Sequence, residues 1–163
     1  MFALLLLVLT AGIAWVLVAP GQRFVAGFAR LLTQPEVHRG PFSVLSGRSS
    51  VTGAFRGRDV TVEVQLKRSR YGQGYLVVSV RMPGAESLDR ADIDARAPDE
   101  AGRQALAAVA AHGLTIVGVE GGWLRARWQP QGFVIFPGRF VEEDWRGVLN
   151  AMDALAASLE ATP

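Results

Sequence analysis

The chain has 163 residues, half of them hydrophobic, and 17 basic against 15 acidic residues give a formal net charge of +2. It contains no cysteine, so disulfide frameworks, cysteine-based zinc sites, thiol catalysis and iron–sulfur clusters are excluded. A net charge this small differs from the strong basic field of a typical nucleic-acid-binding protein, and nucleic acid is therefore not an expected partner.

The first twenty residues contain no charged side chain, and the run from Phe2 to Ala19 is apolar apart from two residues. A helix needs roughly 17 to 25 such residues to cross a hydrocarbon core about 30 Å thick. A cleavable signal peptide is the alternative, but no basic residue precedes the run and Pro20 directly follows its end. The sequence therefore predicts an uncleaved transmembrane anchor over residues 1–20.

Basic residues close to a membrane span tend to stay in the cytoplasm. Arg23, Arg30 and Arg39 all follow the predicted span, and only the amino group of the chain precedes it. We expect a single-pass protein of the plasma membrane with its body in the cytoplasm. If the segment is cleaved or inserted the other way round, the same body becomes extracytoplasmic.

Residues 22–33 have the spacing of an amphipathic helix, with Arg23 and Arg30 between the apolar positions. The apolar positions are Phe24, Val25, Phe28, Leu31 and Leu32. Such a helix could lie on the bilayer surface with its arginines on anionic headgroups, or it could dock on the domain or continue the anchor. A link rich in Pro and Gly over residues 35–41 then completes a juxtamembrane segment over residues 21–41.

The remaining residues, 42–163, are predicted to form one α+β domain that opens with β-strands. A strand over 51–55 is followed by a turn at 56–58 and a strand over 60–66, in which β-branched and polar residues alternate. Residues 75–82 continue this antiparallel meander, and the alternation at 91–97 predicts an edge strand.

A helix is predicted over residues 98–112, because Pro98 suits a first helical position and Gly113 suits a left-handed stop. Short strands follow at 114–119, 123–128 and 133–136. The last element is a helix over 141–159 with one apolar stripe and three acidic residues in its first turn.

The fold class is therefore α+β: an N-terminal transmembrane helix followed by a small domain with antiparallel meanders and helices packed on one face. The order of elements suggests two βββα-like halves, although their sequences do not align.

The best acidic cluster consists of Asp89, Asp92, Asp94, Asp99 and Glu100. Asp92 and Asp94 share one face of the predicted strand over 91–97, and two such carboxylates can bind a divalent cation. Arg90 and Arg96 are close enough in sequence to neutralise them, and no calcium-loop pattern accompanies them. A solvated edge is the favoured interpretation, and a membrane-tethered, metal-dependent hydrolase that uses Asp92 and Asp94 is the alternative function.

Basic residues could instead contact phosphate, and for a tethered domain the natural source of phosphate is the lipid headgroup. The candidates for lipid or phosphate contact are Arg23, Arg30, Arg56, Arg58, Arg68 and Arg70. The simpler interpretation of the last four is that they keep a hairpin soluble and protect it from edge pairing.

No other motif predicts a catalytic residue, a metal site or a cofactor. His38 and His112 lack a paired carboxylate motif, and Trp123, Trp128 and Trp145 are most simply core residues. The sequence therefore favours a non-catalytic, membrane-anchored interaction domain that binds a protein partner or the membrane surface.

Overall fold

The computed structural model describes residues 21–39, 48–66, 74–85, 87–96, 100–128 and 139–161. Within these ranges, no helix combines the length and the apolar character that a membrane span requires. The predicted anchor over residues 1–20 and the predicted strand at 133–136 lie outside the described residues.

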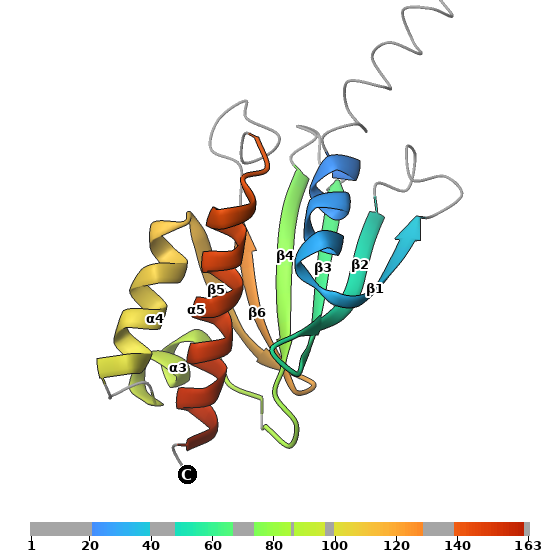
Figure 1. The fold of residues 1–163 in the computed structure, drawn as a ribbon. Helices are drawn as coiled ribbons and strands as arrows, with labels where there is room; N and C mark the ends of the chain where they lie inside the picture. Colours follow the sequence, from blue (N-terminus) through green and yellow to red (C-terminus); the bar gives the residue numbers. More distant parts are fainter. Residues whose placement is uncertain are drawn as a thin grey trace, which may run out of the picture.

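Six strands form one antiparallel sheet in the order β1-β2-β3-β4-β6-β5 (Figure 1). The strands are β1 (Thr33–Arg39), β2 (Arg48–Phe55), β3 (Arg58–Leu66), β4 (Gly74–Arg81), β5 (Leu114–Glu120) and β6 (Trp123–Trp128). Because β4 pairs directly with β6, with Val80 opposite Leu124, the two predicted halves of the chain contribute to a single sheet.

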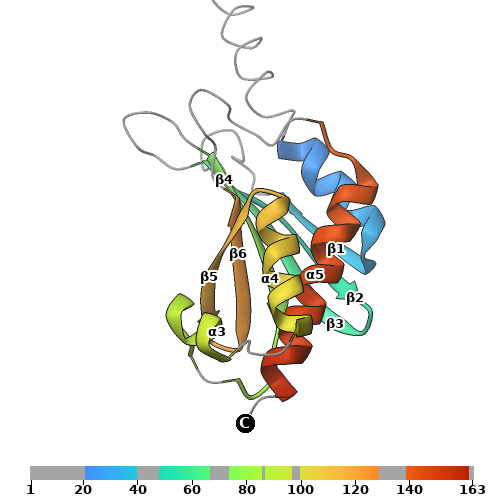
Figure 2. The ribbon, with the colours of Figure 1, turned by 90° about the vertical axis from the view of Figure 1, so that its left-hand side faces the viewer.

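The helices are α3 (Arg90–Arg96), α4 (Glu100–Ala111) and α5 (Glu142–Ala161), and residues 21–31 form a further helix, which we call helix 21–31. Figure 2 shows α4, α5 and helix 21–31 on the same side of the sheet. The predicted α+β class with an antiparallel sheet is therefore confirmed.

The core lies between this helical layer and the sheet, as the alternation in the strands predicts. Val60, Val62 and Val64 of β3 point toward the helices and are buried, whereas Thr61 and Glu63 face the opposite side of the sheet. In α5 the buried positions follow the predicted apolar stripe, including Val148, Leu149, Met152, Leu155 and Leu159. The helix-free face carries a cross-strand row formed by Thr61, Ser79 and Arg125.

Helix 21–31 belongs to the same core, since Phe24, Val25, Phe28 and Leu32 are all buried in it. Of the two alternatives for this amphipathic segment, the described residues show docking on the domain. Its main contact is an aromatic cluster of four rings, Phe24, Phe28, Phe140 and Trp145. Ring centroids within the cluster lie 5.1 to 6.3 Å apart, and most pairs meet edge to face, which is the favourable arrangement for aromatic rings.

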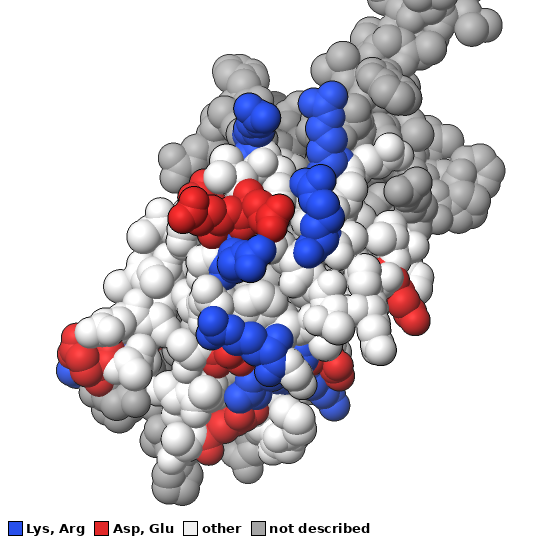
Figure 3. Space-filling model, in the orientation of Figure 1, with Lys and Arg blue, Asp and Glu red and all other residues white. Residues whose placement is uncertain are grey.

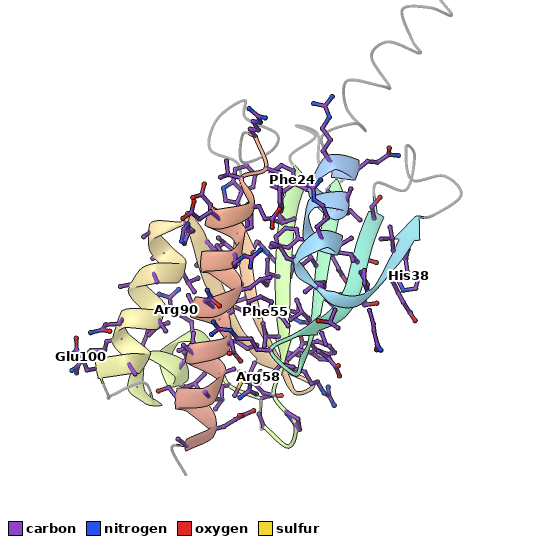
Figure 4. The ribbon with its side chains drawn as sticks, in the orientation of Figure 1. Phe24, His38, Phe55, Arg58, Arg90 and Glu100 are labelled. Carbon is purple, nitrogen blue, oxygen red and sulfur yellow. The ribbon has the colours of Figure 1, made fainter. Side chains whose placement is uncertain are left out.

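α5 connects two ends of the molecule. Trp145 in its first turns packs against Phe24, and Glu160 near its last residue binds Arg58. At about 1.5 Å per residue, these two positions lie about 22 Å apart along the helix. We call the two ends the Phe24 end and the Arg58 end, and Figure 4 shows these two labelled residues toward opposite ends of the molecule.

Two sequence predictions are wrong. The predicted link at 35–41 is strand β1 over its described part; a change of register between Thr33 and Glu36, with Gln34 at φ 50°, lets Pro35 occupy the edge of the sheet. The predicted strand at 91–97 is helix α3, in which only Ile93 is buried. A single buried residue between two aspartates produces the same short alternation in a helix as in a strand.

The other edge of the sheet, β5, is covered by the segment that leads into α3. Leu88 and Val119 exchange two backbone hydrogen bonds, of 3.0 and 2.8 Å, and Arg90 Nη1 donates to the carbonyl oxygen of Ile116 at 3.3 Å. These contacts satisfy backbone groups that an edge strand otherwise leaves unpaired.

Gly27 allows the aromatic cluster to approach helix 21–31. A Cβ atom at this position would lie only 2.6 Å from two carbons of the Phe140 ring. We expect Gly27→Ala to destabilise the domain by about 1–3 kcal/mol, because the overpacking exceeds the gain of about 1 kcal/mol in helix propensity. The melting temperature of the full chain, measured by circular dichroism, is the readout.

The matched control is Ala26→Ser, which changes an exposed position of the same helix and should leave the melting temperature nearly unchanged. Combining Gly27→Ala with Phe140→Leu should cost less than the sum of the two single changes, because the smaller side chain relieves the overlap. A stabilising effect of Gly27→Ala would show that the ring does not pack against this helix.

Candidate functional site

The predicted lipid-contact residues Arg23 and Arg30 lie on helix 21–31, both exposed. They are seven residues apart and so share one side of the helix. Neither forms an ion pair with a described carboxylate. Figure 3 shows basic side chains in this upper part of the molecule.

Arg139 is a third exposed arginine at the Phe24 end, and the sequence analysis did not single it out. It precedes Phe140, whose ring is fixed in the aromatic cluster, and so the backbone of Arg139 is held next to the first residues of helix 21–31. The only sequence signal was its position before the acidic first turn of α5. Glu142, one of those acidic residues, pairs with Arg146 at 2.8 Å.

Arg56 and Arg58 lie at the other end of the sheet, in and beside the turn between β2 and β3. Arg58 pairs with Phe55 in register at the end of the two strands, whereas Gln65 lies opposite Arg48 at the Phe24 end. Arg68 and Arg70 lie outside the described residues. The predicted lipid contacts are therefore divided between opposite ends and do not form one compact surface.

Arg58 is held by two carboxylates of α5. Its Nη1 and Nη2 atoms donate to both carboxylate oxygens of Glu160 at 2.7 Å, and its Nε donates to Asp153 Oδ1 at 2.8 Å. The hydrogen bonds that Arg58 donates to Glu160 are the main cause of its raised pKa, and burial opposes them. The guanidinium is charged at every physiological pH, and this ion triad ties the start of β3 to the end of α5.

A hollow of about 810 Å³ opens at the Arg58 end. Its walls come from three places: the β2–β3 turn, residues 81–85 that follow β4, and the last turns of α5. Met82, Leu88 and Leu159 are buried and form an apolar floor. Arg56 and Arg81 stand on its rim.

Arg81 is held in place by neighbours that carry no formal charge. Its Nη1 donates to the carbonyl oxygen of Gly121 at 3.0 Å, and its guanidinium carbon lies 5.3 Å from the centre of the Trp123 ring. Trp123 is consequently half-buried on the helix-free face and is not the core residue that the sequence predicted. Trp145, by contrast, is a core residue at 5% exposure.

The described members of the acidic cluster do not converge, and Asp99 lies outside the described residues. Asp89 and Asp92 form a reciprocal cap at the start of α3: Asp92 N–H donates to Asp89 Oδ1 at 2.9 Å, and Asp89 N–H donates to Asp92 Oδ2 at 3.2 Å. Asp94 pairs with Arg90 at 3.2 Å, one helical turn away. Residues two positions apart on a helix point in different directions, so Asp92 and Asp94 do not share a face.

Glu100 also serves a helix start, at the first residue of α4. It accepts hydrogen bonds from Arg103 Nη2 and from Gln104 Nε2, both at 2.9 Å. The hydrogen bond from Arg103 and then that from Gln104 hold its pKa below the usual value. In the part of the chain that the structure describes, no three His, Asp or Glu residues are grouped so that they could bind a metal ion.

The two histidines lie far from these carboxylates. His38 is on the edge strand β1, with Nε2 3.9 Å from Glu36 of the same strand, and Figure 4 shows it on the opposite side of the molecule from Glu100. His112 follows α4 and approaches α5 at Gly147, where an added Cβ would lie 3.2 Å from its Nε2. Both positions are those of surface or packing residues.

No protein-family model, no curated protein and no solved structure matches this chain. The arrangement of its own residues is therefore the basis for a functional argument.

Because Asp92 caps α3, we expect its substitution to lower the stability of the protein. Asp92→Ala should destabilise the protein by about 0.5–2 kcal/mol, since it removes one half of the cap. Asp94→Ala, which removes only an exposed pair one turn apart, should cost about 0.3–0.5 kcal/mol. Thermal melts of both variants and of the wild type, each with and without Mg²⁺ or Mn²⁺, provide the test. A melting temperature that rises with metal in the wild type alone would contradict this assignment and favour the hydrolase alternative.

Proposed function

We propose that this protein is a single-pass membrane protein whose α+β domain is a non-catalytic interaction module, held against the cytoplasmic face of the plasma membrane. One observation carries the proposal: the uncharged run over residues 1–20 leads directly into a helix that is buried in the domain core through Phe24 and Phe28. Whatever holds residue 20 therefore also holds the domain, without a flexible linker between them.

The exposed arginines support contact between the Phe24 end and anionic headgroups. Arg23 and Arg139 lie at this end and Arg30 lies two helical turns along the same helix, about 10 Å away at about 1.5 Å per residue. Each basic residue near an anionic leaflet contributes about 1 kcal/mol to binding. The acidic residues at the start of α5 lie at the same end, so the contact is assigned to the side of helix 21–31.

Membrane anchoring is tested by extraction of membranes at alkaline pH. The full chain should stay in the membrane pellet, whereas Leu9→Lys/Ile13→Lys should move most of it to the supernatant, because each lysine at the centre of a span costs about 2.5–3.5 kcal/mol. Val117→Lys, an exposed apolar residue of β5, is the matched control and should stay in the pellet. Release of the wild type by alkali would contradict the anchor.

The orientation of the domain is tested with single dyes at the two ends of α5. The chain has no cysteine, so Glu143→Cys at the Phe24 end and Ala161→Cys at the Arg58 end each provide one labelling site. In the anchored full chain, lipids with a quencher on the headgroup should quench the dye at position 143 and leave that at position 161 nearly unaffected. Equal quenching at both sites would mean that the domain lies flat on the bilayer or points elsewhere.

Arg23→Glu/Arg139→Glu should reduce quenching at position 143 in vesicles that contain anionic lipid and should have little effect in zwitterionic vesicles. Arg56→Glu/Arg81→Gln, at the opposite end, is the control and should change neither value. If the two double variants behave alike, the arginines of the Phe24 end do not contact the headgroups.

A further inference from the structure

The hollow at the Arg58 end is preformed. Pro83 and Gly84 are the central residues of a turn closed by a 3.2 Å hydrogen bond from Ala85 N–H to the carbonyl oxygen of Met82, and Gly84 has the positive φ of 75° that such a turn requires. The Met82 N–H in turn donates to the carbonyl oxygen of Gly122 at 2.8 Å. The floor residue Met82 is therefore fixed from both sides before any ligand arrives, which lowers the entropic cost of binding.

The floor and the rim of this hollow have different chemistry. Met82, Leu88 and Leu159 form an apolar floor, and each is at most 8% exposed, so the floor offers an occupant a small apolar contact. The rim carries three guanidinium groups, of which Arg58 is already neutralised by Asp153 and Glu160. An occupant of the hollow therefore meets apolar surface below and cationic groups above.

The two other rim arginines have no carboxylate partner among the described residues. Arg56 is exposed, and its guanidinium carbon lies 5.7 Å from the centre of the Phe55 ring. Arg81 is oriented by a carbonyl oxygen and by the Trp123 ring, which leave its charge uncompensated. Guanidinium groups bind carboxylates with two parallel hydrogen bonds, and oriented ones lose little freedom on doing so.

The acidic groups of the hollow limit the kind of ligand that it can bind. Asp59 and Glu160 line the same walls; Glu160 is already paired with Arg58, whereas Asp59 repels a continuous polyanion such as a nucleic-acid backbone. A ligand with separate carboxylates and apolar side chains between them can place its charges on Arg56 and Arg81 and avoid both acidic groups. An acidic peptide segment has this pattern.

We propose that the hollow at the Arg58 end binds an acidic, leucine-containing segment of a protein partner, with an apolar side chain on the Met82–Leu159 floor and carboxylates on Arg56 and Arg81. This inference names the partner class of the interaction domain proposed above and in that respect rests on it. The site lies at the opposite end of the molecule from Phe24 and the start of helix 21–31, so the proposed anchor leaves it open to a partner in solution.

The test uses the full chain in nanodiscs of zwitterionic lipid, with empty nanodiscs as the blank. The probe is a fluorescein-labelled octapeptide of alternating Glu and Leu, followed by fluorescence anisotropy. We expect saturable binding with a dissociation constant below about 1 mM. Peptides of alternating Lys and Leu, and of alternating Glu and Ser, should bind at least about tenfold more weakly. Failure of the Glu and Leu peptide to saturate, or equal binding of all three, would overturn the proposal.

Substitutions at the two ends of the molecule test whether the peptide binds in the hollow. Arg56→Glu/Arg81→Gln should weaken binding at least about tenfold, and Arg56→Glu alone, which changes an exposed side chain and should leave the fold intact, should weaken it several-fold. Arg23→Glu/Arg139→Glu at the Phe24 end should bind as the wild type does. Equal losses at both ends would show a general charge effect and would overturn the site.

Inorganic pyrophosphate serves as the competitor. If it displaces the peptide at micromolar concentrations while the Glu and Ser peptide binds as well as the Glu and Leu peptide, the hollow is a phosphate site and the proposal is wrong. Peptide binding by a chain that alkaline extraction releases from membranes would refute the anchor and leave the hollow assignment standing. The two proposals can therefore fail independently.

Discussion

The packing of helix 21–31 against α5 is the contact on which the rest of the arrangement depends. Four aromatic rings meet there, and Phe140 comes close enough only because position 27 has no side chain. Aromatic rings bury large areas and have specific geometry, so this cluster fixes both the position and the direction of the helix. The segment that enters the domain from the apolar N-terminus is consequently part of the core, and a force applied to residue 21 is transmitted to the domain as a whole.

The aromatic cluster attaches the start of α5 to helix 21–31, and the ion triad attaches the end of α5 to the sheet. Arg58 sits at the start of β3, and its bonds to Asp153 and Glu160 attach the last turns of α5 to the sheet. The three side chains are one-fifth to one-third exposed, and breaking such a pair leaves a poorly solvated charge, whereas exposed pairs contribute little. With both of its ends fixed, α5 holds the Phe24 end and the Arg58 end at a constant separation.

Much of the fold follows from periodicity in the sequence. The valines of β3 alternate with polar residues, and the stripe in α5 repeats at helical spacing, so both elements were predictable. β1 was not, because Pro35 and a change of register disguise an edge strand. Helix α3 was not predicted, because its short alternation of polar and apolar residues also fits a strand. The spacing of Asp89 and Asp92 is nevertheless that of a helix cap. The candidate arginines were predictable as a set, but which of them share a surface depends on strand direction and packing that no local pattern records.

The positions and partners of these arginines matter more for function than their number. In the sequence Arg56 and Arg58 look equivalent, since both flank the same turn; in the structure one is neutralised by two carboxylates and the other is free of any described carboxylate. Arg81, which the sequence places only at the end of a strand, is brought to the same hollow as Arg56 by the pairing of β2, β3 and β4. The arginines therefore form two separate groups, one at the Phe24 end and one at the hollow of the Arg58 end, which a net charge of +2 does not reveal. Because α5 keeps them apart, the membrane contact and the partner binding proposed above use separate surfaces of one domain.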